Sequence, residues 1–227
     1  TDPQYPIPPQ WQAIFNYLYE GGYITSPNVL FERMFHDEPK LFSLRIFTAL
    51  GGTKTDGRPP TISGFSRGVS LDLEEAISKL LGEFLERYPL MIYRRKDLVR
   101  ASMHHLTQGN ARFLNANDLA GFSDWQKDLF PGRRFTDDST FFWVDCEELT
   151  AKTRSLVPAQ LVFWNYDSLQ EPVEPYLRQP ITNGAAGHFT RTEAIIAAIY
   201  EIIQRDAFLI HWLNGIAPSR VAHDSIT

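Results

Sequence analysis

The chain contains two segments, 118 residues apart, that repeat the same spacing of charged side chains. In each segment, a Glu-Ala-Ile triplet is followed by a second glutamate and then by an arginine. Glycines precede both copies, in Ser63–Gly68 and in Thr182–Gly187. The repeated residues are Glu75, Glu83 and Arg87 in the first copy, and Glu193, Glu201 and Arg205 in the second. We therefore expect a duplicated unit in which a strand end, a Gly-rich turn and an acidic helix follow one another.

The acidic side chains of each copy share one face of the predicted helix. At about 100° per residue they fall within an arc of roughly 80°, opposite an apolar stripe. Two interpretations are open. In the first, the acids are solvated, and Glu75 and Glu193 complete capping boxes with Asp72 and Thr190. In the second, carboxylates of both helices converge on a cation, for which Mg²⁺ is the natural candidate because it prefers oxygen ligands.

The second copy lies in the longest helical pattern of the chain, from Thr190 to about Leu213. Beyond Arg205 this pattern is apolar all round, so we expect the helix to be buried. A carboxylate on a buried helix is costly unless a cation accompanies it. We therefore expect Glu201 to have a positively charged partner, which is Arg87, Arg205 or a divalent ion.

The glycines before each copy suggest an anion site. A Gly-rich turn at a helix N-terminus offers backbone N–H groups to an anion, and Ser66, Arg67 and Asn183 are candidate further donors. Neither turn matches GxxxxGK[ST] or GxGxxG, so the standard nucleotide motifs are absent from them. Anion-binding turns beside carboxylates nevertheless suit a magnesium–nucleotide site, because the metal bridges phosphate oxygens and acids.

Apolar periodicity predicts the remaining elements. A helix is expected from Trp11 to Glu20, ended by Gly21-Gly22, and the helix of the first copy from about Asp72 to Tyr88. The segment Thr53–Pro60 reads as a turn. Strands are expected at Leu41–Leu50, through Ile62, at Phe141–Val144 and at Leu156–Trp164. Together these elements indicate the α/β class.

Composition restricts the class of protein. With 227 residues and 43% apolar residues, the chain is long enough to bury a sizeable core. The net charge of −5, without a basic stripe, argues against nucleic acid as a partner. A single cysteine, Cys146, fits a reducing cytoplasmic setting, and no apolar run reaches membrane-spanning length. The start at Thr1, without a signal-peptide pattern, leads us to expect a piece of a longer protein.

At the repeated residues the sequence resembles the YcaO family. The resemblance runs through Gly82–Tyr88 and Thr182–Gly187, includes the acids and arginine of the second copy, and extends more loosely over Trp143–Val162. It covers roughly residues 40 to 215. It implies an α/β, YcaO-like fold in which β-sheets back two pseudo-repeated glutamate-bearing helices. Residues 1–40 would be an N-terminal extension with short helices, and residues 41–227 a YcaO-type ATP-binding domain, incomplete at its C-terminus.

The resemblance also implies an activity. ATP and Mg²⁺ would serve to phosphorylate a backbone amide oxygen of a ribosomally synthesised peptide, which leads to an azoline, a thioamide or an amidine. The implied partners are the precursor peptide and a leader-peptide-binding protein, and a homodimer is compatible with it. The implied metal ligands are Glu83, Glu86, Glu193, Glu201 and Gln204. The implied ATP-binding residues are Ser66, Arg67, Arg87, Asn183 and Arg205.

One departure from the family pattern leaves an alternative open. Gln204 stands where the family usually has the second glutamate of ExxER, and a neutral amide binds a divalent cation more weakly than a carboxylate does. The alternative interpretation is therefore a nucleotide-binding or structural module that has lost catalysis.

Overall fold

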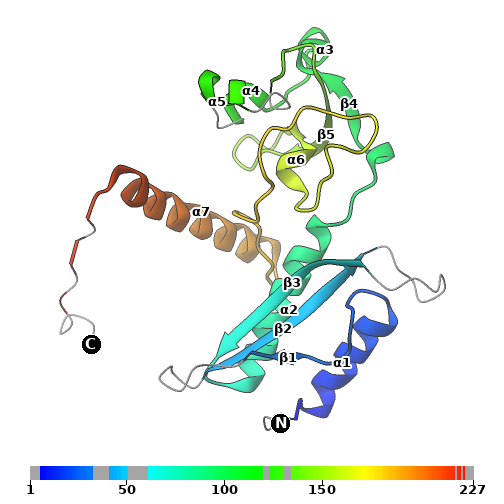
Figure 1. Cartoon of the computed structure of the whole chain (residues 1–227), viewed down its shortest axis with the longest axis vertical. Coiled ribbons are helices and arrows are strands. Elements are labelled where there is room, and N and C mark those ends of the chain that lie inside the picture. Colours follow the sequence, from blue (N-terminus) through cyan, green and yellow to red (C-terminus); the bar gives the residue numbers. More distant parts are fainter. Residues whose placement is uncertain are drawn as a thin grey trace. The chain divides into compact units, whose positions relative to one another are not determined.

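The computed structural model describes residues 6–32, 41–50, 61–119, 123–129, 134–217, 219, 220 and 222. The predicted turn at Thr53–Pro60 lies outside them. The chain divides into two compact units, residues 1–181 and 182–227. Figure 1 labels most of the helices and strands of both units.

The first sheet of the first unit is antiparallel, with its strands in the order β1–β2–β3. These strands are β1 (Leu30–Phe31), β2 (Phe42–Leu50) and β3 (Thr61–Ser70). The register of β2 and β3 places Ile46 opposite Ser66, with an irregularity between Thr48 and Ala49. The strands predicted at Leu41–Leu50 and through Ile62 are thus confirmed, and among the described residues β3 is the last strand of this sheet.

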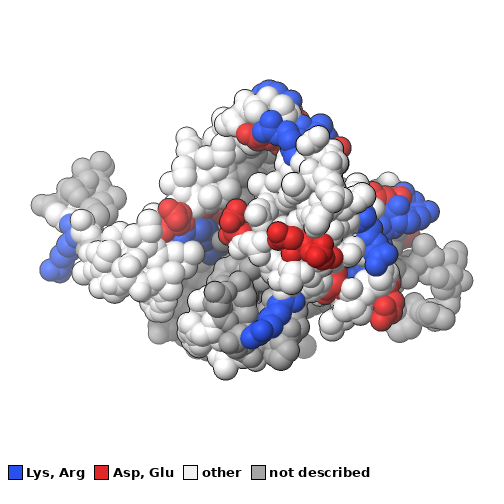
Figure 2. Space-filling model, turned by 90° about the horizontal axis from the view of Figure 1, so that it is seen from above, with Lys and Arg blue, Asp and Glu red and all other residues white. Residues whose placement is uncertain are grey.

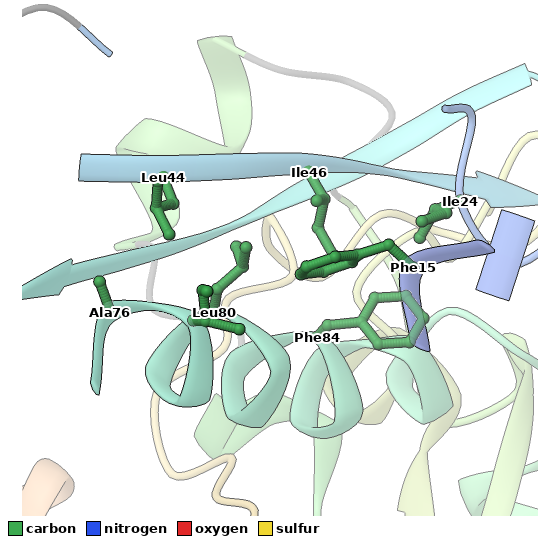
Figure 3. Close-up of a cluster of buried hydrophobic side chains, with 8 residues drawn as sticks. Phe15, Ile24, Leu44, Ile46, Ala76, Leu80 and Phe84 are labelled. Carbon is green, nitrogen blue, oxygen red and sulfur yellow. The ribbon is translucent and has the colours of Figure 1, made fainter. Parts of the chain in front are cut away.

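Two helices pack against this sheet, α1 (Pro9–Glu20) and α2 (Leu73–Leu90). Both agree with the sequence prediction, although α2 continues past Tyr88 and includes Pro89. Its N-cap, Asp72, accepts a hydrogen bond from the Glu75 N–H at 2.8 Å. Figure 3 shows α2 running along one face of the strands, with apolar side chains between them. The buried cluster consists of Phe15, Ile24, Leu44, Ile46, Ala76, Ile77, Leu80 and Phe84.

The prediction of a Gly-rich turn before the first acidic helix is wrong. Ser63–Gly68 lies within strand β3, and the glycine has a packing role instead. A Cβ atom on Gly68 would lie 1.9 Å from the Ala76 carbonyl oxygen and 2.6 Å from the Leu80 nitrogen of α2. Gly68 is therefore required because the helix backbone passes directly over the strand, rather than because a turn needs it.

The second sheet of this unit is also antiparallel, in the order β4–β5–β6. Its strands are β4 (Val99–Ser102), β5 (Thr140–Glu147) and β6 (Arg154–Pro158). Short helices accompany it: η2 (Arg95–Asp97), α3 (Met103–Gln108), α4 (Ala116–Leu119), α5 (Asp124–Leu129) and α6 (Ala159–Val162). Its core gathers around Phe141, Trp143 and Leu177, which are fully buried.

One predicted strand of this sheet is confirmed and the other is too long. Phe141–Val144 lies inside β5, whereas the strand predicted at Leu156–Trp164 ends at Pro158, where α6 begins. Pro158 has φ −54° and forms the N-cap of α6. Because proline fixes φ near the helical value and lacks an N–H, it ends the strand ladder and starts a helix readily.

A buried ion pair ties the segment after α6 to the second sheet. Arg95 donates to the carbonyl oxygens of Asp167, Gln170 and Pro172 and pairs with Glu174. Glu174 is 4% exposed, and it also accepts the Phe142 N–H and the Tyr166 hydroxyl. Burial, followed by this bond to Glu174, raises the pKa of Tyr166. The carboxylate is thus fully paired, as a buried charge requires.

The second unit consists of one long helix, α7 (Arg191–Asn214), with its flanking segments. Thr190 is its N-cap, and Gly215 ends it with φ +62°, as predicted for a helix from Thr190 to about Leu213. The expectation that this helix is buried is wrong, because none of its residues is buried. Within its own unit, the described residues provide no second helix or sheet for the apolar side chains to pack against.

Two surface properties bear on the class of protein. None of the helices in the described part of the chain combines the length and the apolarity needed to cross a membrane. Figure 2 shows Lys and Arg side chains in small groups on the face that it draws, several of them beside Asp or Glu. The charge on that face is therefore mixed in sign.

The close approach at Gly68 predicts a large effect of one added methyl group. We expect Gly68→Ala to lower the free energy of unfolding by about 1–3 kcal/mol, because the new Cβ overlaps the backbone of α2. Gly82→Ala is the matched control: its Cβ has no neighbour within 4 Å, and it lies in a helix, so stability should rise by about 0.5–1 kcal/mol. Urea denaturation of both variants measures the difference, and a tolerated Gly68→Ala would contradict the packing.

Candidate functional site

Glu83 on α2 is held by two partners from the first sheet and its own helix. Its carboxylate accepts the backbone N–H of Arg67 at 3.2 Å and pairs with the Arg87 guanidinium at 2.7 Å. Arg87 also donates to the Phe65 carbonyl oxygen at 3.0 Å and lies 5.2 Å above the ring of Trp164. Glu83 and Arg87 are about one quarter and one fifth exposed. The carboxylate is thus oriented and partly withdrawn from water.

The guanidinium of Arg67 belongs to a different cluster. It pairs with Glu32 at 2.7 Å and donates to the Ser43 hydroxyl, and Glu32 also pairs with Arg45. Arg45 is opposite Arg67 in the register, and it alternates with Leu44 and Ile46, which face α2. The side chain of Arg67 therefore lies on the sheet face opposite α2, away from Glu83. Sequence reasoning missed Glu32, Ser43 and Arg45, for which polar positions alternating along Leu41–Leu50 were the available signal.

Among the residues predicted to donate hydrogen bonds to ATP, Ser66 is the most deeply buried. It is 0% exposed, and because it pairs with Ile46 it faces the cluster under α2. Its hydroxyl has no hydrogen-bond partner. In this structure the hydroxyl is covered by the protein, so its predicted contact with ATP requires movement of the packed helix or strand.

In the second unit, Glu201 on α7 has the same kinds of partners as Glu83. Its carboxylate accepts the backbone N–H of Gly184 at 3.0 Å and pairs with Arg205, four residues later, at 3.6 Å. The predicted cationic partner of Glu201 is thus Arg205, although Glu201 is 28% exposed rather than buried. Gly184 has φ +83°, so here the preceding glycines do form the predicted turn, and Asn183 is exposed in it.

Glu193 and Glu75 contact residues at the start of their helices. Glu193 accepts the Thr190 hydroxyl at 2.7 Å and lies 2.9 Å from His188. The hydrogen bond from Thr190 is the main cause that lowers the pKa of Glu193. Glu75 accepts the Ser70 hydroxyl and pairs with Lys79, which chiefly lowers its pKa. Both N-caps form as predicted. A backbone hydrogen bond from Thr190 also helps to lower the pKa of Glu193, as a capping box requires. In the first copy, the Asp72 N–H instead donates to the Ser70 hydroxyl at 3.3 Å.

The predicted metal ligands are divided between the two units. Glu83 and the partly exposed Glu86 belong to the first unit, and Glu193, Glu201 and the exposed Gln204 to the second. Their carboxylate and amide oxygens are the donor types that Mg²⁺ accepts. Among the described residues, no three His, Cys, Asp or Glu side chains are grouped so that they could hold a metal ion. Their convergence on one ion stays a prediction.

Residues 67–227 match a family model described as "YcaO cyclodehydratase, ATP-ad Mg2+-binding". The matched region contains both acidic helices and covers more than half of the chain. The chain belongs to the YcaO family. ATP and Mg²⁺ are therefore the ligands of its family, and the predicted resemblance is confirmed. No curated protein sequence matches this YcaO chain significantly.

Solved structures confirm the predicted YcaO-like α/β fold. A heterocyclase in complex with substrate and cofactor matches 94% of this chain, with a TM-score of 0.67 and 19% identity. YcaO from Methanopyrus kandleri, bound with AMPPCP and Mg²⁺, also matches 94%, with a TM-score of 0.51 and 16% identity. The heterocyclase TruD matches 68%, with a TM-score of 0.56 and 23% identity. The chain spans 30%, 48% and 23% of the lengths of these three proteins.

The contacts of Glu193 predict its titration. We expect its carboxyl to titrate below the usual glutamate pKa, because the Thr190 hydroxyl stabilises the ionised form. This bond then contributes stability above the pKa of the unfolded chain, and the contribution is lost as the pH falls through the folded pKa. Thr190→Val should raise the pKa, and Thr190→Ser should keep it low. NMR titration of the carboxyl carbon distinguishes them, and equal values in both variants would contradict the assignment.

Proposed function

We propose that this YcaO protein takes part in the ATP- and Mg²⁺-dependent activation of a peptide backbone amide by O-phosphorylation, during modification of a ribosomally synthesised peptide. One observation carries the proposal: Glu83 and Glu201, in the two copies, each accept a backbone N–H and pair with an arginine four residues later. The residues of both arrangements lie within residues 67–227, the region matched by the family model. The product would be an azoline, a thioamide or an amidine.

The proposed ligands follow from the acids and arginines of both copies. Glu83, Glu86, Glu193 and Glu201, with Gln204, would hold Mg²⁺ through oxygen atoms. Held by these oxygen atoms, Mg²⁺ would supply positive charge that balances the phosphates of ATP. Arg87 and Arg205 would balance the charges of Glu83 and Glu201 before the metal binds. The proposed donors to ATP are Ser66, Arg67, Arg87, Asn183 and Arg205, among which the exposed Asn183 and Arg205 need the least rearrangement.

The proposed partners follow from the chemistry of the reaction and from the structural neighbours. The substrate would be a precursor peptide, as one matched heterocyclase is described in complex with substrate and cofactor. A leader-peptide-binding protein would deliver it, and a homodimer is part of the same proposal. A cytoplasmic location suits an ATP-consuming enzyme with a free cysteine, Cys146.

A second candidate function rests on Gln204. It lies exposed on α7, one turn after Glu201, and contributes a neutral amide where the family pattern has a carboxylate. A site that has lost one negative charge holds a divalent cation less tightly. In this interpretation the protein binds a nucleotide or serves as a structural module without catalysis.

Removal of one carboxylate charge from either helix should weaken nucleotide binding. We expect Glu83→Gln and Glu201→Gln to raise the Kd for Mg²⁺·ATP roughly tenfold or more in the full-length protein, since even outer-shell changes have effects of 10- to 100-fold. Isothermal titration calorimetry measures this. Glu74→Gln and Asp206→Asn are matched controls, because they remove exposed acids from the same helices without touching the predicted ligands. Wild-type affinity in both ligand variants would refute the proposed site.

Restoring the missing charge should act in the opposite direction. We expect Gln204→Glu to lower the Kd for Mg²⁺·ATP, because an added carboxylate attracts the cation more strongly than an amide does. A second titration series, with Mg²⁺ replaced by Na⁺, is the control. A gain in affinity that depends on Mg²⁺ comes from metal binding, whereas a gain in both series comes from a change in the helix itself. Tighter binding with new turnover of a peptide would favour the second candidate for the wild-type chain, whereas turnover by the wild type would exclude it.

A further inference from the structure

The indole of Trp164 lies against the arginine of the first acidic helix. Trp164 follows α6, and its backbone N–H donates to the Leu90 carbonyl oxygen at 2.8 Å, beside the end of α2. The guanidinium carbon of Arg87 lies 5.2 Å from the centroid of the indole. A cation at this distance over an aromatic face is attracted by the ring, and tryptophan attracts it most strongly. Trp164 therefore gives Arg87 a preferred position from outside its own helix.

Strand β3 limits where the indole can lie. A Cβ atom added to Gly64 would lie 3.0 and 3.2 Å from Cζ3 and Cη2 of Trp164, and 3.5 Å from the Met91 sulfur. Because Gly64 has no side chain, the six-membered ring of the indole can approach the strand this closely. The indole thus contacts both the backbone of β3 and the guanidinium of Arg87.

The hydrogen bonds of Arg87 restrain only one end of its guanidinium. Nη1 pairs with Glu83 at 2.7 Å and donates to the Phe65 carbonyl oxygen at 3.0 Å. Nε is buried and has no hydrogen-bond partner among the described residues. Two bonds through one nitrogen leave the plane of the guanidinium free to tilt. A contact on the face of that plane removes this freedom, and Trp164 supplies it.

The corresponding ion pair of the second copy is held less closely. Arg205 is 58% exposed, against 21% for Arg87, and it lies 3.6 Å from Glu201, against 2.7 Å between Arg87 and Glu83. The described part of the chain places no aromatic ring over the Arg205 guanidinium. The shorter and less exposed of the two ion pairs is therefore the one with an indole beside it.

We propose that Trp164 is a positioning residue of the nucleotide site: its indole holds the Arg87 guanidinium in the orientation that directs the Glu83 carboxylate. This role rests on the proposed function, because Arg87 and Glu83 are among its proposed ligands. Trp164 acts through Arg87 and is not itself a proposed ligand. Glu83 is then oriented by two separate segments, since β3 supplies the N–H that it accepts and the segment after α6 supplies the ring.

The first test is NMR spectroscopy of the arginine side chains, recorded on the full-length protein without metal or nucleotide. The ring current of the indole displaces the Arg87 Nε–H signal. We expect Trp164→Leu to abolish this displacement and Trp164→Phe, which keeps an aromatic face, to retain part of it. Trp125→Leu is the matched control, because it removes an exposed indole on α5. An Arg87 signal that is the same in Trp164→Leu and in the control would overturn the proposal.

The second test is Mg²⁺·ATP binding, measured by isothermal titration calorimetry. We expect Trp164→Leu to raise the Kd about three- to tenfold, the effect of one lost cation–π contact at a partly buried site. Trp164→Phe should recover part of the affinity, and Trp125→Leu should bind as wild type. Recovery by phenylalanine separates a role of the aromatic face from one of bulk alone. Equal losses in the leucine and phenylalanine variants, or no loss in either, would overturn the positioning role.

A third variant moves the indole without removing it. In Gly64→Ala the new Cβ would lie 3.0 Å from the ring, so the indole has to shift by a few tenths of an ångström. We expect the Arg87 Nε–H signal to move in this variant, which keeps the proposal testable if Trp164→Leu fails to fold. Combined with Trp164→Leu, Gly64→Ala should add no further change, because the contact that it disturbs is gone. Additive changes would overturn the indole as the link.

The positioning role and the proposed function fail in different experiments. If the wild type does not bind Mg²⁺·ATP, the proposed function is refuted, while the Arg87 signal still decides whether Trp164 orients the guanidinium. If Glu83→Gln weakens binding but Trp164→Leu does not, the proposed function stands and the positioning role is refuted.

Discussion

The contact between α2 and β3 at Gly68 determines the geometry of the first acidic helix. Because Gly68 has no side chain, the backbone of α2 passes over the strand at a distance that a Cβ atom would prevent. At this distance the Glu83 and Arg87 side chains of α2 contact the backbone of β3. The buried cluster beneath, with Ile46 and Phe84, fixes the same distance from the apolar side. The orientation of the Glu83 carboxylate is thus a consequence of core packing.

The two copies surround their glutamates with the same kinds of partners, although the backbone before each helix has a different conformation. Glu83 accepts an N–H from an extended strand, and Glu201 accepts one from a turn whose glycine has a positive φ. In both, an arginine one helical turn later supplies the opposite charge. The shared requirement is therefore a carboxylate fixed by one main-chain donor and one cation, whichever segment precedes the helix.

The sequence predicts the elements better than it predicts their surroundings. The periodicity of Trp11–Glu20 and of α7 gives helices with nearly correct ends, because capping residues and glycines act locally. The glycines of Ser63–Gly68 are ambiguous, since a close helix–strand contact and a turn both require glycine. The exposure of α7 depends on which segments share its unit, and an apolar sequence carries no information about that. The partners Glu32 and Trp164 come from distant segments, so only the fold brings them to Arg67 and Arg87.

Trp164 connects the second sheet to the acidic helix. It follows α6, and its backbone N–H donates to the Leu90 carbonyl oxygen at the end of α2. Its ring lies under the Arg87 guanidinium and would touch a Cβ atom on Gly64 of β3 at 3.0 Å. The indole of Trp164 thus contacts both the counter-ion of Glu83 and the strand that supplies the N–H to Glu83. A residue far from Glu83 in the sequence thereby contacts the guanidinium that balances the charge of Glu83.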